Sequence, residues 1–482
     1  MQKKFVGSLA LLLFVNLLVK PVWIFGIDLE VQNQVGAEAY GLYAAMLSFV
    51  MIFNIVLDLG LAHYSNREIA QDPDTLARHF SELFLLKLSL GLFYFLLALV
   101  LGYFMDYWQK ASSILIWLSL AQVFSSALFF LRSHLAGLHL FKWDAFFSVL
   151  DKSLMILLAG YFIYLSSGGI NIEIFAILQA GSFGFSALLA TALILWKVPY
   201  FKPHFKLAKF KSRLNSSLPY ALLIFLMALY TRVDSVMLQQ IVGEQETGIY
   251  AQAFRLLDAL NQPAYLFSVI LLPMFATLFA KKESVSDLAK LAFVMIYVMS
   301  LSIALAAFFE SESLMAKLYV AHGEQSSILL RWLIFSSLAF GATYVFGTML
   351  TAKGSLALLN GIAFSGFVLN IILNAVLIPT YGAQGAAFAT LVTQGLSAIA
   401  QAFYSFRQAS IHWGWGFFWR FLGFSVQAIL LGFLIHYYLD WIWWLKMISI
   451  ALFSVLSVFF WKLLAWQMGI DLLRKRFLVN SR

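Results

Sequence analysis

Four charged residues lie in the strongly apolar segments on either side of a turn, within residues 230–263. Arg232 and Asp234 come before a short turn. Arg255 and Asp258 come after it, three positions apart and so on one face of a helix. Inserting an ionisable side chain in the middle of a membrane costs about 2.5–3.5 kcal/mol, so such a residue is expected to have a partner or a functional role. If this stretch crosses a membrane, it therefore predicts a site for an anion or a coupling ion.

Other charged residues occur in similarly apolar surroundings. Lys20 precedes Pro21, and Asp151 precedes Lys152. Because Lys and Arg side chains suit phosphate, we predict that the deep cations hold the phosphates of a headgroup. The candidates are Lys20, Lys152, Arg232 and Arg255. The deep carboxylates are the candidates for binding a coupling ion, H⁺ or Na⁺, namely Asp58, Asp234 and Asp258.

The composition predicts that these charges lie in a membrane. Of the 482 residues, 62% are hydrophobic, 17% are aromatic and only 11% are charged. Soluble domains average about 25% charged residues, so we expect this surface to face lipid. The sequence has no cysteine, which excludes disulfides, thiolate metal sites and cysteine nucleophiles. The motifs of metalloproteases, phosphate loops, dinucleotide sites and nucleophile elbows are also missing, so we expect neither an enzyme nor a cofactor or metal.

Apolar runs near twenty residues long predict an all-helical integral membrane protein with about fourteen spans. The first run has no cleavage site of an export signal, so we take it as the first span. The predicted spans are 5–28, 39–64, 80–103, 112–135, 144–166, 172–197, 217–241, 249–279, 289–309, 328–351, 356–378, 384–406, 418–439 and 444–465.

Basic residues gather on one side of this layout and account for the formal net charge of +9. With a cytoplasmic N-terminus, that side includes the basic connector 197–216 and the tail around 474–476. The opposite loops carry mainly acidic residues, with little basic beyond Lys110 and Lys317. This asymmetry predicts that both termini are cytoplasmic. The connector is expected to lie on anionic lipid. No nucleic-acid-binding motif accompanies it, so we do not expect it to bind nucleic acid.

Several of the charges have a simpler explanation. Arg255 and Asp258 could pair with each other along one helix. Lys87 is expected to reach back to the cytoplasmic interface, and Lys152 is open to the same explanation. Asp28, near the end of the first span, is expected at the outer surface.

Two short segments repeat at the same internal spacing and predict a duplicated chain. Val-Gly at 242–243 and Gly-Ile-Tyr-Ala at 248–251 echo Val-Gly at 35–36 and Gly-Leu-Tyr-Ala at 41–44. Each copy falls at the first turn of a set of six spans, so the two sets cross the membrane in the same sense. The predicted parts are an N-lobe (1–196, spans 1–6), the connector (197–216), a C-lobe (217–407, spans 7–12), and spans 13–14 with the tail (408–482).

Residues 370–390 carry the most specific motif. Asn370-Ile-Ile-Leu-Asn374 precedes Leu-Ile-Pro-Thr-Tyr-Gly-Ala-Gln-Gly-Ala-Ala-Phe-Ala-Thr at 377–390. The pattern resembles a signature of the multidrug/oligosaccharidyl-lipid/polysaccharide exporter superfamily. Segments 40–43, 58–61 and 67–70 are similar to its polysaccharide-transport branch, the O-antigen and capsule flippases of bacteria.

The resemblance implies a two-lobed bundle that exposes its substrate alternately to the two sides of the inner membrane. Such flippases move undecaprenyl-pyrophosphate-linked sugar units from the cytoplasmic to the periplasmic leaflet. The implied partners are this lipid-linked oligosaccharide, membrane lipids, and a polysaccharide polymerase with other assembly proteins. In lipid II flippases, an extra pair similar to spans 13–14 helps form a groove for the lipid tail.

Three other functions stay open. Within the same superfamily these are a lipid II-type flippase and a multidrug or cation antiporter, for which the carboxylates would bind the cation. The third is a scaffold or sensor that transports nothing and whose charges are all paired. The sign of the charge around the deep residues discriminates among these functions.

Overall fold

The computed structural model describes residues 15–16, 18–59, 61, 74–138, 140–197 and 207–463. Within these ranges, twelve helical stretches are long and apolar enough to cross a membrane. Two of the twelve are interrupted by a non-helical glycine, Gly36 in Leu18–Ile52 and Gly382 in Leu356–Gln408. Counting each of these two as a pair of crossings gives fourteen, so the prediction of an all-helical, multi-pass membrane protein is confirmed.

Some predictions fall outside the described ranges. These are the start of the first span, the motif at 67–70, the basic residues at 198–206 and the tail at 474–476.

The chain divides into two compact units, Met1–Gly248 and Ile249–Arg482. The elements of the first unit are η1 (Val22–Asp28), α2 (Leu29–Ile52), α3 (Ile55–Asp58), α5 (Asp74–Phe104), α6 (Tyr107–Gly137), α7 (Phe141–Tyr164), α8 (Ile172–Lys197) and α9 (Leu207–Ile241). Helix α10 (Glu244–Ala280) starts in the first unit and continues into the second. The second unit then contains α11 (Ser286–Phe309), α12 (Ser311–Leu318), α13 (Gly323–Leu333), α14 (Ser336–Lys353), α15 (Leu356–Gln408), α16 (Gly414–Tyr438) and α17 (Trp443–Phe460).

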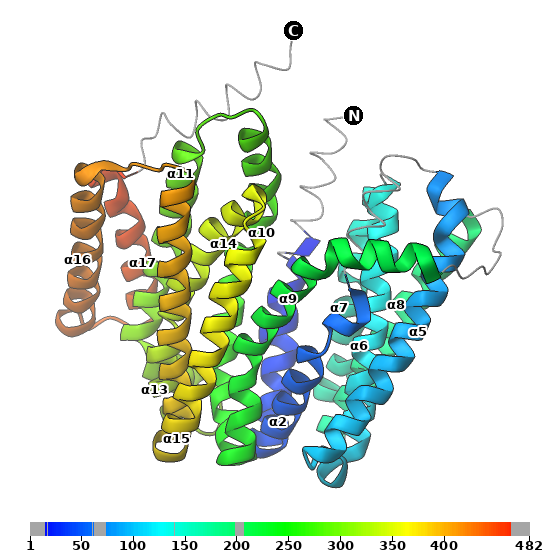
Figure 1. Ribbon diagram of the computed structural model, residues 1–482. Coiled ribbons are helices and arrows are strands. Elements are labelled where there is room, and N and C mark those ends of the chain that lie inside the picture. The colour runs from blue at the N-terminus through cyan, green and yellow to red at the C-terminus, as the bar shows by residue number, and fades with distance from the viewer. Residues whose placement is uncertain are drawn as a thin grey trace. The chain divides into compact units, whose positions relative to one another are not determined.

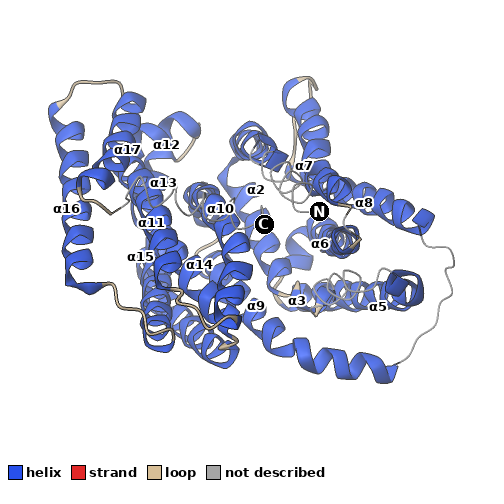
Figure 2. Cartoon of the chain, turned by 90° about the horizontal axis from the view of Figure 1, so that it is seen from above, coloured by secondary structure: helices blue, strands red, loops and turns tan. Residues whose placement is uncertain are grey.

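Helix α6 is the central helix of the first unit. It packs against α2, α5, α7 and α8, as the view along the helices shows (Figure 2). Its buried side chains include Phe130, Leu131 and Leu135, which share an apolar core with Phe80 of α5 and Ala190 of α8. These helices are apolar around most of their circumference, because one face meets neighbouring helices and the other meets lipid.

In the second unit, α15 is a hairpin rather than one rod (Figure 1). Asn370 and Thr393, at nearly equal distances from Gly382, form a hydrogen bond of 3.5 Å across the two arms. Gly382 has φ 53° and ψ −133°, which glycine tolerates and other residues rarely adopt. Helix α11 lies against both α14 and the terminal pair α16–α17, so it joins the hairpin side of this unit to its last two helices.

The first glycine has a positive φ in both copies of the repeat. Gly36 has φ 81° and Gly243 has φ 117°, each five positions before the second glycine of its copy. Positive φ explains why both turns use glycine.

The compact units do not follow the predicted lobe boundary at the connector. Helix α9 begins at Leu207, so residues 207–216 of the predicted connector are helical. The predicted lobes rest on the sequence repeat, and this division stays a prediction.

Candidate functional site

Two of the predicted cations come together in the first unit. The Nζ of Lys152 lies between two aromatic rings, 5.0 Å from the ring centre of Trp23 and 4.9 Å from that of Phe183. It also lies 3.2 Å from an oxygen of Asp151. A cation over an aromatic face is stabilised by the ring's quadrupole, more strongly when water is excluded. Lys152 is thus held among aromatic rings and beside Asp151, and its extension to the membrane surface stays a prediction.

Lys20 joins this group through an irregular helix. It lies just before Pro21 and η1, a seven-residue π-helix. Proline removes a backbone donor, and π-type turns are frequent at functional sites. Lys20 is close enough to interact electrostatically with Lys152, Arg132 and Asp151.

Arg132 is a member of this group that is not among the predicted cations. It lies near the end of α6, where its Nε donates to Asp144 of α7 at 2.8 Å. We call Lys20, Arg132, Lys152, Asp144 and Asp151 the cation cluster. Three cations and two carboxylates leave one positive charge, so the cluster can attract an anion.

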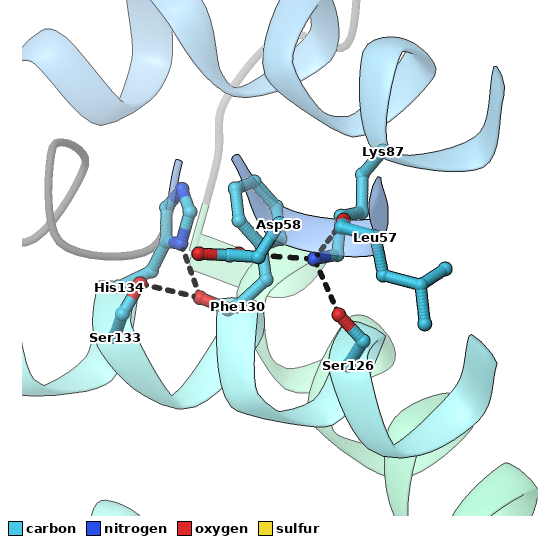
Figure 3. Close-up of polar contacts among 7 residues, drawn as sticks. All are labelled: Leu57, Asp58, Lys87, Ser126, Phe130, Ser133 and His134. Atoms are coloured by element: carbon cyan, nitrogen blue, oxygen red, sulfur yellow. Dashed lines mark hydrogen bonds and ion pairs between the residues drawn. The ribbon is translucent and has the colours of Figure 1, made fainter. Parts of the chain in front are cut away.

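Asp58 is paired with a lysine that the sequence analysis placed elsewhere (Figure 3). Lys87 of α5 donates to Asp58 at 3.1 Å, to the carbonyl of Leu57 at 2.7 Å and to the hydroxyl of Ser126 at 2.8 Å. Its side chain is only 4% exposed, so the prediction that Lys87 extends to the interface is wrong. An ammonium has three donors, and all three are used here.

A break in span two creates this arrangement. Helix α2 ends at Ile52, the chain restarts as the single turn α3, and Leu59 then adopts a left-handed conformation with φ 46°. At this break the carbonyl of Leu57 in α3 accepts from Lys87 of α5. Depth counted along a regular helix cannot predict it.

Asp28 is also buried, against the expectation that it lies at the outer surface. It is 1% exposed and accepts hydrogen bonds from Tyr40 at 3.0 Å and from Gln32 at 3.3 Å. Gln32 follows Asp28 by four positions and so lies on the same helical face, a signal that the sequence already contained.

The four charges that first drew attention fall in both units. Arg232 and the buried Asp234 lie on α9, in the first unit. Arg255 and Asp258 lie on α10, in the second unit, and both are half-buried. A common cavity for these residues stays a prediction.

The signature motif forms a buried polar network in the second unit. Asn374 donates to Asn370 at 3.0 Å, and Asn370 donates to Thr393. Tyr250 and Thr390 share a hydrogen bond of 3.2 Å. The bonds to Thr393 and Thr390 join different helical segments, as polar side chains do inside a membrane, and the sequence pattern identified these asparagines only as a family motif.

The described helices form the bundle of a multi-pass membrane protein, with charged side chains inside several of its apolar helices. The fold is similar to the lipid II flippase MurJ in an inward closed conformation, with a TM-score of 0.69, 16% identity, and coverage of 94% of this chain and 99% of MurJ. It is also similar to an inward-facing multidrug resistance MATE family transporter of the MOP superfamily, with a TM-score of 0.64, 14% identity, and coverage of 83% and 98%.

Sequence comparison gives the family. An uncharacterised membrane protein of Methanocaldococcus jannaschii is 23% identical over 375 residues, which cover 74% of this chain and 88% of the relative. Residues 8–279, more than half of the chain, match the family of polysaccharide biosynthesis proteins. The chain belongs to that family, and the resemblance drawn from its motifs is confirmed.

Proposed function

We propose that this protein flips a lipid-linked oligosaccharide, an undecaprenyl-pyrophosphate-linked sugar unit, across the bacterial inner membrane without changing it chemically. Both termini would lie in the cytoplasm, and the sugar unit would leave the cytoplasmic leaflet. Membership of a polysaccharide biosynthesis family and a fold similar to a lipid II flippase support this proposal. A polysaccharide polymerase and other assembly proteins would take up the product.

The observation that carries the proposal is the net positive cation cluster, whose Lys20 and Lys152 lie in helices long and apolar enough to cross a membrane. Sugars and pyrophosphate cannot cross hydrocarbon unaided, because each unsatisfied polar group costs several kcal/mol there. A protein site that replaces water around the phosphates removes this cost, while the lipid tail stays in the bilayer. Lys20 and Lys152 would contact the phosphates, and Arg232 and Arg255 complete the proposed set.

Alternating exposure of this site would move the headgroup from one leaflet to the other. Coupling to H⁺ or Na⁺ belongs to the proposal, with Asp58, Asp234 and Asp258 as its candidates. For Asp58, the coupling ion would have to compete with Lys87, because that ammonium already binds the carboxylate.

The test is flipping of a fluorescent undecaprenyl-pyrophosphate oligosaccharide in proteoliposomes, with and without an ion gradient. Lys20→Gln and Lys152→Gln each remove one charge-assisted hydrogen bond, worth about 1.5–3 kcal/mol. We expect apparent affinity to fall roughly tenfold to a hundredfold. Lys290→Gln is the matched control, because Lys290 also lies over an aromatic ring, 4.6 Å from Phe417, but in the second unit. Equal flipping by all three variants would refute the proposed role of the cluster.

A lipid II-type flippase is the second candidate, and the similarity to MurJ favours it. Supplying lipid II in the same vesicles distinguishes the two substrates, since they share the pyrophosphate and differ in the sugar. A multidrug or cation antiporter is disfavoured by the positive balance of the cation cluster, which repels a cationic drug. Flipping that persists unchanged without an ion gradient would argue against ion coupling but not against the flippase itself.

A further inference from the structure

The two copies of the repeated glycine motif pack against each other in the first unit. A Cβ added to Gly41 of α2 would overlap the backbone carbonyl of Glu244. A Cβ added to Gly248 would overlap the backbone carbonyl of Ala37. Glu244 is four residues before Gly248, and Ala37 is four residues before Gly41. Each glycine therefore contacts the same position of the other copy, and the contact is reciprocal. All four residues belong to the first unit.

Backbone meets backbone at this contact, so no side chain can move aside to make room. Small residues allow helices in membranes to approach this closely. The second glycine of each copy of the repeat is therefore the residue through which the two copies are in contact. A methyl group at either position would force the two helices apart.

A second set of contacts surrounds the glycine pair. Lys110, at the start of α6, forms an ion pair with Glu244, which also accepts from Gln239 at 3.0 Å. Gln240 donates to the carbonyl of Met105 at 3.0 Å. The turn between α9 and α10 is therefore held to the turn between α5 and α6, within residues 1–248.

The ion pair beside the glycine contact is partly exposed. Lys110 and Glu244 are 39% and 25% exposed, and ion pairs so exposed are weak because water and salt screen them. Lys110 is also one of the few basic residues predicted on the outer side, and Glu244 is its partner. Helix α10 continues from Gly248 into the second unit, so the contact holds the point where the chain passes from one unit to the next.

We propose that the Gly41–Gly248 contact and the Lys110–Glu244 ion pair form a latch, closed in this structure, that must open in every transport cycle. This proposal rests on the proposed function, because transport is the process during which the latch would open. The glycines set how closely the helices approach, and the ion pair fixes the register between the two turns.

The chain has no cysteine, so Lys110→Cys/Glu244→Cys introduces the only two thiols. A bifunctional methanethiosulfonate reagent should join them and lower flipping in proteoliposomes at least tenfold, and dithiothreitol should restore it. Each single-cysteine variant, treated in the same way, is the control. Joined protein that flips at the rate of unjoined protein would overturn the latch.

A second measurement does not depend on transport. A cysteine placed at Ala37 should react with a membrane-impermeant maleimide several-fold faster when Gly41→Ala or Gly248→Ala is added. Gly181→Ala on α8 is the matched control, because nothing lies within 4 Å of its added Cβ. Unchanged labelling would overturn the latch even if the sugar is flipped. Faster labelling in a protein that flips no sugar would support the close glycine contact and refute the proposed function.

Discussion

Replacing Lys87 by methionine removes the charge that holds the end of span two. Methionine keeps the length of the side chain but leaves the Asp58 carboxylate without its ammonium partner. It also leaves the carbonyl of Leu57 and the hydroxyl of Ser126 without the donor that binds them now.

The expected cost follows from burial. Removing one partner of a buried ion pair costs about 3–5 kcal/mol, because the other charge stays behind. Asp58 is 20% exposed and keeps some access to solvent, so we expect the lower end, about 3 kcal/mol. Removing both charges in Lys87→Met/Asp58→Asn should destabilise less than the two single changes added together, by roughly 0.5–3 kcal/mol.

The assay is reversible unfolding in mixed micelles of a mild detergent and sodium dodecyl sulfate, followed by circular dichroism. Lys110→Met is the control, because its exposed ion pair should contribute about 1 kcal/mol at most. If Lys87→Met costs no more than Lys110→Met, Lys87 reaches the interface after all, and the buried pair is wrong. Additive effects of the Lys87 and Asp58 changes would likewise refute the coupling between them.

Two further substitutions test the turn of α15 and the buried Asp28. Gly382→Ala should destabilise the protein by about 1–3 kcal/mol, because alanine is strained at positive φ. Gly361→Ala is the control and should cost less, because there is open space around Gly361. Equal costs for the two substitutions would contradict the hairpin turn. Tyr40→Phe should cost about 1–3 kcal/mol, because a buried carboxylate loses a donor. Tyr43→Phe breaks a hydrogen bond to the neutral Gln179 and should cost about 1 kcal/mol. A larger cost for Tyr43→Phe than for Tyr40→Phe would argue against a charged Asp28.

The sequence by itself determined the number of crossings, the turns and the family. A span needs about twenty apolar residues in a row, and this property is local, so it can be read without knowing any neighbour. The glycine turns at 36 and 243 were visible as a repeat, and the motif at 370–390 identified the superfamily. The sequence also marked Lys20 and Lys152 as candidate headgroup ligands, and that role stays a prediction.

Only the tertiary structure decided which charges have partners. Lys87 meets Asp58 because span two breaks at α3, and Arg132 joins the cation cluster because α6 is packed between α7 and α8. Asp28 is buried because the chain turns back at Gly36 and brings Tyr40 to it. Hydropathy describes each helix alone, whereas the energy of a buried charge depends on the atoms that other helices place around it.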